Sequence, residues 1–167
     1  LTQRLEGVRV RCVYNDSADN LWACTSGKGI YCFSNDNTLK VYDSSNGANG
    51  NKFRTITQLV DGTVLAAGDS GLTFIKNGTV TETIGYQEGM ANTKVLCVIE
   101  KDGGILLAGT DGNGIDVIKN GKVIDNYGKD DGLSSEVVLR MVADKSGDGI
   151  FVVTSNNICY MTDDNIR

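Results

Sequence analysis

The sequence of 167 residues contains no histidine, which limits the kinds of catalysis that its side chains could carry out. Ser-His-Asp and Cys-His arrangements need an imidazole to take the proton of the nucleophile, so they are excluded within this chain. Metal motifs that contain histidine are excluded for the same reason. Paired carboxylates that hydrolyse glycosides stay open, because sequence does not give their separation in space, but no feature of the sequence favours them.

Three short stretches could be taken for ligand or metal loops, and each is better interpreted as a turn. Gly27-Lys28-Gly29 lacks the GxxxxGK[ST] spacing and the following helix of a phosphate-binding loop. The acid-rich residues 111–116 have Ile115 at a calcium-ligand position and no closing glutamate. Residues 17–22 match part of the Asp box of sialidases, but their tryptophan comes too early and the glycine is missing. We therefore predict no metal and no cofactor.

Five cysteines and one tryptophan are the other candidates for reactivity or for ligand stacking. Five is an odd number, so complete pairing into disulfides is impossible, and no CxxC motif is present. We interpret the cysteines as small apolar core residues, with a disulfide or a redox role as the alternative. Trp22 could stack on a sugar, but it lies in an apolar run and its predicted equivalents in the other copies, Leu65, Leu106 and Phe151, are apolar, so it is predicted to belong to the core. The cysteines, all within predicted strands, are Cys12, Cys24, Cys32, Cys97 and Cys159.

Charge and hydropathy argue against two classes of partner. The formal net charge is −5, whereas a nucleic-acid surface needs clustered lysine and arginine. No apolar run approaches about 18 residues, so no membrane contact by this segment is predicted. Residues 1–10 lack the charged-then-apolar layout of a signal peptide. We expect the chain to begin within a longer protein, because its repeat is cut at both ends; a cytosolic chain is the alternative.

An internal repeat of about 43 residues sets the elements that must position these side chains. The apolar residue that opens the third strand of each copy recurs at Ile30, Leu72, Ile115 and Ile158, in steps of 42, 43 and 43 residues. Short apolar runs alternate with Gly, Asn and Asp turns, which is typical of antiparallel strands joined by tight turns. Asn77-Gly78 and its counterpart 43 residues later predict type I′ hairpins.

Four short antiparallel strands within about 40–45 residues match one β-propeller blade. We therefore predict an all-β fold of four blades, with an all-β sandwich as the alternative. The blades cover residues 8–47, 51–90, 91–133 and 134–167. Residues 1–7 are interpreted as the end of a fourth strand and its linker, the tail of a preceding blade. The predicted strands are 8–14, 21–24 and 29–33; 53–59, 64–67, 71–75 and 79–84; 94–100, 105–108, 114–118 and 122–127; and 136–143, 150–153 and 157–161.

The repeat motifs resemble those of the two-component regulator propeller repeat. That repeat has a Gly-Leu linker, a V-x-x-I-x-x-D strand, a Leu-Trp and Gly-Thr strand, and a Gly-Gly-Leu start to the third strand. Only one copy keeps the tryptophan, and the fourth copy has Asn156-Asn157-Ile158 in place of Gly-Gly-Leu. The matching segments are Asp131-Gly132-Leu133, Glu88-Gly89-Met90, Val10-x-x-Val13-x-x-Asp16, Val138-x-x-Met141-x-x-Asp144, Leu21-Trp22 and Gly109-Thr110.

This resemblance implies a seven-bladed propeller that lies outside the cytoplasmic membrane. Such propellers are sensor domains of histidine kinases, hybrid two-component regulators or diguanylate cyclases, with carbohydrates as the ligand class. We therefore expect this chain to be part of a larger propeller. An open arc of four blades exposes its end blades, which predicts self-association; closure into a four-bladed ring through residues 1–5 is the alternative.

The expected ligand surface follows from how propeller blades are connected. Loops from a fourth strand to the next first strand share one face with loops from second to third strands. Short polar side chains converge there, which suits a hydroxyl-rich ligand. From this polar set, which also includes Thr93, Ser134, Ser26, Lys28, Asp69, Ser70, Asn156 and Asn157, the predicted ligand-binding residues are Asn92, Lys94, Asp111, Asn113, Ser135 and Glu136.

The sequence thus favours an extracytoplasmic module that senses a small-molecule ligand, such as an oligosaccharide, and has no catalytic activity of its own. Two alternatives stay open. One is a protein-interaction scaffold that uses the same polar loops. The other is a propeller enzyme that acts on glycosides and whose catalytic carboxylates lie partly in blades outside this chain.

Overall fold

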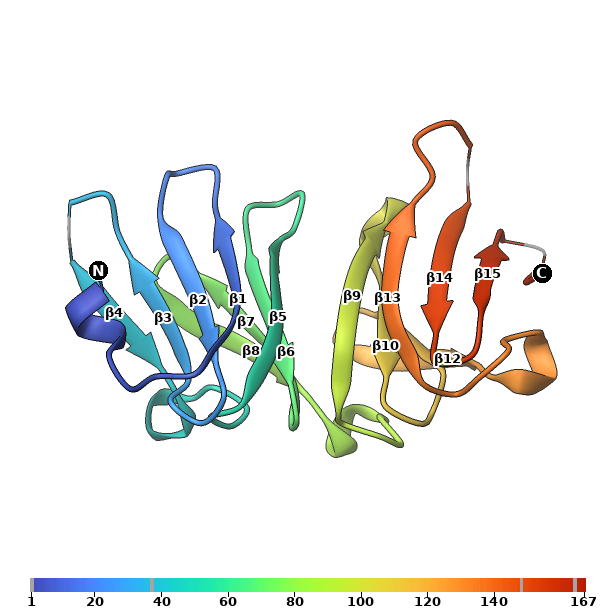
Figure 1. The fold of residues 1–167 in the computed structure, drawn as a ribbon, viewed down its shortest axis with the longest axis horizontal. Helices are drawn as coiled ribbons and strands as arrows, with labels where there is room; N and C mark the ends of the chain where they lie inside the picture. The colour runs from blue at the N-terminus through green and yellow to red at the C-terminus, as the bar shows by residue number, and fades with distance from the viewer. Residues whose placement is uncertain (1, 37, 148, 164) are drawn as a thin grey trace. The chain divides into compact units, whose positions relative to one another are not determined.

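A computed structural model describes residues 2–36, 38–147, 149–163 and 165–167. Its strands form four separate antiparallel sheets, each built from strands consecutive in the sequence (Figure 1). The chain divides into two compact units, residues 1–85 and 86–167, and each unit contains two sheets. The all-β fold made of propeller blades is therefore confirmed, and the two units are described separately below.

Unit 1 holds the first two blades. In each blade the four strands pair in sequence order, β1-β2-β3-β4 and β5-β6-β7-β8. The strands are β1 Val10–Asn15, β2 Leu21–Thr25, β3 Ile30–Phe33 and β4 Leu39–Tyr42, followed by β5 Phe53–Gln58, β6 Val64–Gly68, β7 Gly71–Lys76 and β8 Thr79–Ile84.

Unit 2 holds the third blade, of four strands, and a fourth blade that has three strands among the described residues. After β15, Ile166 pairs with Met161 in an isolated antiparallel bridge, so the chain begins to follow the edge of the sheet again. The strands are β9 Val95–Lys101, β10 Ile105–Thr110, β11 Ile115–Lys119 and β12 Lys122–Tyr127, followed by β13 Val138–Ala143, β14 Ile150–Thr154 and β15 Ile158–Met161.

Short 3-10 helices lie in the linkers between blades, where the sequence predicts only loops, and also before β1 and between β9 and β10. In η2 the Asp43 side chain accepts a hydrogen bond from the Ser45 amide, and Gly47 ends the turn in the left-handed conformation. None of the helices in the described segments is long and apolar enough to cross a membrane. The helices are η1 Thr2–Leu5, η2 Ser44–Asn46, η3 Tyr86–Glu88, η4 Asp102–Gly104 and η5 Lys129–Asp131.

Helix η1 replaces the strand end that was predicted within residues 1–7, whereas their assignment to the tail of a preceding blade stays a prediction. These residues were predicted to contain the end of a fourth strand, but Thr2–Leu5 form a 3-10 helix. A strand is stable only when a neighbouring strand satisfies its backbone groups, and no strand is paired with this segment in the described part of the chain.

The two sheets of each unit pack face to face through an apolar core. In unit 1 this core joins Trp22 and Ile30 of the first blade to Phe53 and Ile56 of the second. In unit 2 the corresponding core joins Leu107 and Ile115 of the third blade to Val138 and Met141 of the fourth, among others. Each blade thus buries one face against its neighbour, and the loops at both ends of the strands are left to form sites.

Strand pairing corrects one detail of the repeat alignment. Trp22 pairs with Tyr14 and Cys32, and the residue with the same two neighbours in the third blade is Leu107, not Leu106. The apolar run of β10 begins one residue earlier than the others, because Ile105 already pairs with Lys101. Aligning the runs by their first residue therefore shifts the third copy by one position.

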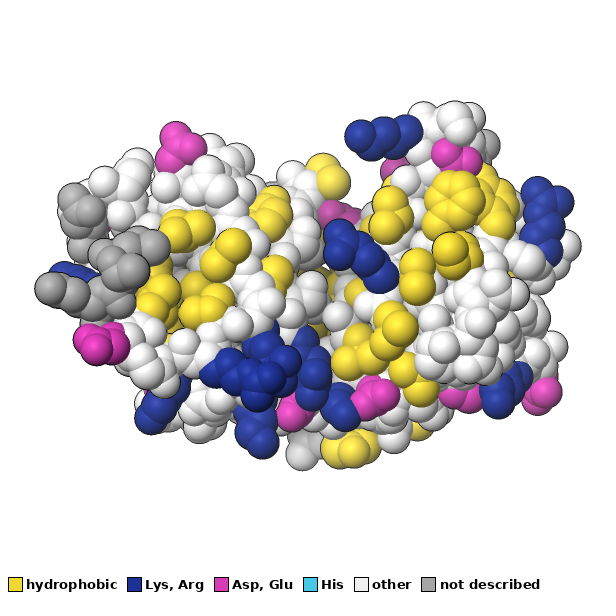
Figure 2. Space-filling view, in the orientation of Figure 1, with side chains coloured by type: hydrophobic (Ala, Val, Ile, Leu, Met, Phe, Trp, Pro, Cys, Tyr) yellow, Lys and Arg dark blue, Asp and Glu magenta, His cyan; other side chains and the backbone are white. Residues whose placement is uncertain are grey.

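The outward face of the fourth blade is apolar and exposed. Ile30 and Ile115, which open the third strands of the first and third blades, are fully buried, whereas Ile158 at the same position is 61% exposed. Leu139, Val142 and Phe151 are exposed beside it, and Figure 2 shows hydrophobic side chains gathered over β13 and β14. Self-association through such a face stays a prediction.

Candidate functional site

Unit 2 brings the predicted ligand-binding residues together at one end of its strands. The linker that leads into β9 meets the β10–β11 loop, because the Asp111 amide donates to the carbonyl of Lys94 at 2.9 Å. The linker that leads into β13 meets the same loop, because the amides of Gly112 and Gly114 donate to the Glu136 carbonyl at 3.1 and 2.9 Å. Three segments that are distant in sequence therefore form one loop cluster.

Side chains of this cluster hold the loops in place. The Asn92 amide donates to the Asp111 carbonyl at 2.9 Å, and the Lys94 ammonium forms an ion pair with the Asp111 carboxylate. The Glu136 carboxylate accepts a hydrogen bond from the Lys129 amide at 2.9 Å. Many of the polar groups of the cluster thus bond to one another, which fixes the positions of the polar groups that stay accessible to solvent.

Accessibility separates the six residues into two kinds. The side chains of Lys94 and Asp111 are 42% and 30% exposed, and Asn113 and Glu136 are also half-buried. Ser135 is only 7% exposed, and its hydroxyl bonds to the Ser155 hydroxyl at 2.7 Å. Ser135 therefore positions its loop, and so does Asn92, whose side chain bonds to the Asp111 carbonyl and the Lys94 backbone amide. The other four residues present polar atoms to solvent, and their role in binding stays a prediction.

Loops in unit 1 repeat this arrangement at the corresponding positions. The amides of Gly27 and Gly29 donate to the Asn51 carbonyl at 3.0 and 2.9 Å, and the Asp69 amide donates to the Lys52 carbonyl at 3.0 Å. Arg54 forms an ion pair with Asp69 at 2.8 Å. The other polar residues of the predicted surface in this unit, Ser26, Lys28 and Ser70, lie in these loops.

Asp116 is a buried carboxylate at the end of a stretch that was interpreted as a turn. It belongs to the acid-rich residues 111–116 and also to the predicted strand 114–118; it lies inside β11, as the strand prediction has it, and is 1% exposed. Its Oδ1 accepts hydrogen bonds from the amides of Asn126 at 2.9 Å and Asn113 at 3.3 Å, whereas Oδ2 has no partner in the described structure. Burial raises the pKa of Asp116, and the two amide hydrogen bonds oppose that rise only in part.

Replacing this carboxylate with a neutral amide should stabilise the protein at neutral pH. We expect Asp116→Asn to raise the free energy of unfolding at pH 7 by about 1 kcal/mol, because an ionised oxygen no longer stays buried without a partner. The pKa of Asp116 in the folded protein lies above 3.8, so wild-type stability is lost as pH rises through that raised pKa. Urea unfolding should therefore show a higher free energy of unfolding for Asp116→Asn than for the wild type at pH 7, and little difference between them near pH 4.

Asp130→Asn is the matched control for this prediction, because it removes the same charge from a residue that is exposed. If Asp116→Asn is as destabilising at pH 7 as a lost buried hydrogen bond, the amide hydrogen bonds to the carboxylate outweigh its burial and the argument is wrong.

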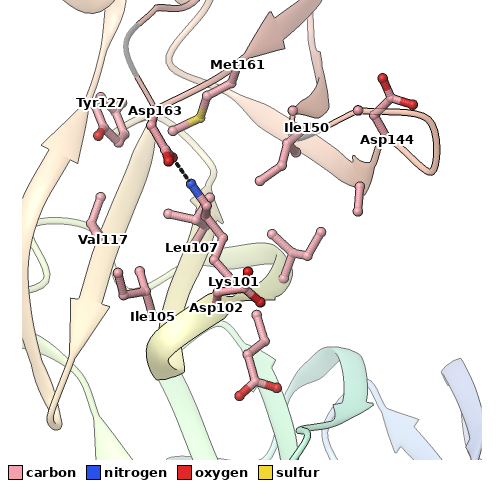
Figure 3. Close-up of a pocket in the computed structure, with 15 residues that line it drawn as sticks. Lys101, Asp102, Ile105, Leu107, Val117, Tyr127, Asp144, Ile150, Met161 and Asp163 are labelled. Carbon is pink, nitrogen blue, oxygen red and sulfur yellow. Dashed lines mark hydrogen bonds and ion pairs between the residues drawn. The ribbon is translucent and has the colours of Figure 1, made fainter.

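A cavity that the sequence did not predict opens at the other end of unit 2. It has a volume of about 730 Å³ and lies between the β9–β12 and β13–β15 sheets. Ile105, Leu107 and Val117 line its third-blade wall, and Ile150 and Met161 line the fourth-blade wall (Figure 3). Each side chain is an ordinary core residue in sequence, so only the spacing of the two sheets shows that they surround an opening.

Metal and thiol chemistry receive no support from the described residues. No group of three or more Cys, Asp or Glu side chains could hold a metal ion among them. Four of the five cysteines are buried, Cys12 is half-buried, and all five lie in strands, which confirms their predicted place. Burial raises the pKa of Cys97 to about 12 and also raises the pKa of Cys24, so these thiols stay protonated and are poor nucleophiles at neutral pH.

Comparison with known proteins places the fold among β-propellers. No family model and no curated protein sequence matches the chain. Two structures of one extracellular domain from B. thetaiotaomicron, described as part of a one-component and of a hybrid two-component system, match with TM-score 0.80 and 18% identity. They cover 96% of this chain, which spans 25% of that domain.

Propellers with other roles match as well. Virginiamycin B lyase from Staphylococcus aureus has TM-score 0.73 and 15% identity, over 95% of this chain and 54% of the lyase. The WD40 propeller domain of Doa1 has TM-score 0.68 and 18% identity, over 90% of this chain and 49% of that domain. At such identities the likeness establishes the fold alone. The chain thus consists of β-propeller blades, and its resemblance to two-component regulator propellers is confirmed at the level of the fold.

Proposed function

We propose that this chain is part of an extracytoplasmic sensor propeller and that it binds a small hydroxyl-rich ligand, of the carbohydrate class, without catalysing a reaction. The loop cluster of unit 2 is the proposed site, with Lys94, Asp111, Asn113 and Glu136 as the contacting residues. Asn92 and Ser135 are proposed to position the loops. The observation that carries the proposal is the convergence of these residues from three separate segments.

The chemistry of the loop cluster supports a carbohydrate. Carboxylate, amide and ammonium groups together offer both donors and acceptors to hydroxyl groups. Because an ion pair and hydrogen bonds to neighbouring groups already hold these side chains, little conformational entropy is lost when a ligand binds. The shared fold with the extracellular domain from B. thetaiotaomicron supports the extracytoplasmic location and the sensing role.

Ligand binding can be tested with a thermal-shift screen of the whole chain against neutral and acidic oligosaccharides. A ligand that binds only the native state should raise the melting temperature by about 5 °C or more at a hundredfold excess over its Kd. Lys94→Gln and Glu136→Gln should weaken binding of that ligand about tenfold, because each removes a charge-assisted hydrogen bond. The fold should survive, since the exposed Lys94–Asp111 pair contributes at most about 1 kcal/mol.

Lys119→Gln is the matched control, because Lys119 is exposed at the far end of β11 and lies outside the loop cluster. Equal weakening by the control would show that only overall charge matters. No oligosaccharide-induced shift at any concentration would contradict the proposal, and so would release of a cleaved product from a glycoside.

A further inference from the structure

The cavity of unit 2 combines an apolar interior with an acidic rim. Its walls are aliphatic and sulfur-containing side chains of the core, and Tyr127 adds an aromatic ring. Its volume of about 730 Å³ lies within the usual range for small-molecule sites. An organic molecule of modest size can therefore enter without unfolding either blade.

Carboxylates dominate the charged groups around this cavity. Four acidic side chains line it, against the single ammonium of Lys101. The Asp144 carboxylate accepts hydrogen bonds from the Ser146 amide at 2.9 Å and the Tyr160 hydroxyl at 2.8 Å. These bonds lower the pKa of Asp144, which keeps it ionised at neutral pH. The four acidic residues are Glu100, Asp102, Asp144 and Asp163.

An exposed ion pair spans the cavity from one blade to the other. Lys101, at the end of β9, pairs with Asp163, which follows β15 (Figure 3). The Asp163 side chain is 81% exposed and the Lys101 side chain is 26% exposed, so solvent screens the pair mainly from the Asp163 side, and breaking it costs about 1 kcal/mol or less. Figure 3 shows Asp102 at the main-chain end of Lys101, away from the ion pair, and Asp144 across the cavity, beyond Ile150.

We propose that this cavity binds a small organic cation, with its apolar body against Leu107, Val117 and Ile150 and its ammonium or amidinium group at the acidic rim. The cation displaces Lys101 from Asp163 and takes the place of its ammonium. A neutral apolar molecule would fill the same interior but gain no attraction from Asp102, Asp144 and Asp163, and an anion would be repelled. This site lies at the opposite end of unit 2 from the loop cluster and does not depend on it.

Three probes of nearly equal shape separate charge from apolar contact: benzamidine, benzamide and benzoate. Each is titrated into the ¹⁵N-labelled whole chain at low ionic strength, and amide chemical shifts are followed. Benzamidine should bind at least tenfold more tightly than benzamide and shift amides of residues 99–105, 144–150 and 161–163. Benzoate should not bind. Raising the salt concentration to a few hundred millimolar should weaken benzamidine binding severalfold, because the rim charges are accessible to solvent.

Two variants test the named groups. Asp163→Asn should weaken benzamidine binding about three- to tenfold, because it removes the carboxylate that the cation would occupy. Met161→Trp should abolish binding by filling the cavity, and Met161→Leu should retain binding, which controls for a change of core residue. Asp130→Asn, which removes a charge outside the cavity, should leave the affinity unchanged.

Several outcomes would overturn the inference. Equal binding of benzamidine and benzamide would show an apolar crevice without charge selection. Shifts confined to residues outside the cavity, or equal losses in Asp163→Asn and Asp130→Asn, would show non-specific attraction to an acidic protein. A failure of benzamidine to bind would overturn this site alone, since the oligosaccharide screen reads out the loop cluster.

Discussion

Trp22→Ala should lower the free energy of unfolding by about 3–5 kcal/mol, the range found when large aromatic side chains are removed from protein cores. Trp22 is 4% exposed and stacks on Tyr42 with ring centroids 5.8 Å apart. Its indole N–H donates to Asp16 Oδ2 at 2.7 Å. The substitution therefore creates a cavity between the first two blades and also leaves a buried carboxylate with one donor fewer. Urea unfolding followed by circular dichroism measures the loss.

Phe151→Ala is the matched control, because strand pairing puts Phe151 at the position of Trp22 in the fourth blade. Phe151 is 42% exposed, so its removal should cost only about 1 kcal/mol. Equal losses of unfolding free energy in the two variants would contradict the burial of Trp22, and stacking of Trp22 on a sugar would again be an alternative.

Trp22→Phe isolates the hydrogen bond to Asp16. We expect a loss of about 1–3 kcal/mol at pH 7. Burial alone would raise the pKa of Asp16, but hydrogen bonds from Trp22, Asn20 and Ala18 outweigh it and lower the pKa below 3.8. The stability due to Asp16 is therefore present above 3.8 and is lost as pH falls through the lowered pKa. The difference in the free energy of unfolding between wild type and Trp22→Phe should therefore become smaller as pH falls through the lowered pKa of Asp16.

Gly114→Ala should lower the free energy of unfolding by about 3 kcal/mol or more. Gly114 has φ +66°, where an alanine is itself disfavoured by about 1–2 kcal/mol. An added Cβ would also lie 2.0 Å from the carbonyl oxygen of Tyr127, at the end of β12. The neighbouring fourth strand would have to move away, and the β10–β11 loop of the proposed carbohydrate site would move with it.

The fourth blade provides the control for this glycine. At the equivalent positions, a Cβ added to Gly29 or Gly71 would lie 2.2 Å from the carbonyl oxygen of Tyr42 or 2.0 Å from that of Ile84. The fourth blade has Asn157 there, and no fourth strand among its described residues. Asn157→Ala should therefore cost no more than about 1 kcal/mol, for its hydrogen bond to the Ile158 amide. If Asn157→Ala lowers the free energy of unfolding as much as Gly114→Ala does, the contact with the fourth strand is not the cause of the loss in Gly114→Ala.

This comparison also explains why the fold could be predicted from sequence. The glycine before the third strand is a local requirement that recurs in the first three copies of the repeat, and the Asn-Gly hairpin recurs in the second and third. Asn77 and Asn120 indeed have φ of +50° and +51°, and the glycines that follow them also have positive φ, as type I′ turns require.

The sites were harder to predict because they depend on how neighbouring sheets meet. The loop cluster could be expected, since propeller connectivity puts those loops on one face. The roles within it could not, because the bond between Ser135 and Ser155 joins two loops of the fourth blade. The burial of Asp116 is only weakly indicated in the sequence, by a carboxylate between two apolar strand residues. Nothing in the sequence indicates the cavity, because Lys101 and Asp163 are 62 residues apart and meet only in the folded unit.

The measurement that tests the proposed function most directly is a residue-resolved titration of the ¹⁵N-labelled chain with the oligosaccharide that gives the largest thermal shift. We predict saturable shifts of amides in residues 92–94, 111–114 and 134–137, no such shifts around Lys101 and Asp144, and an oligosaccharide that is recovered unchanged. Saturable shifts centred elsewhere on the chain would contradict the proposed site, and a cleaved oligosaccharide would contradict the assignment as a binding module.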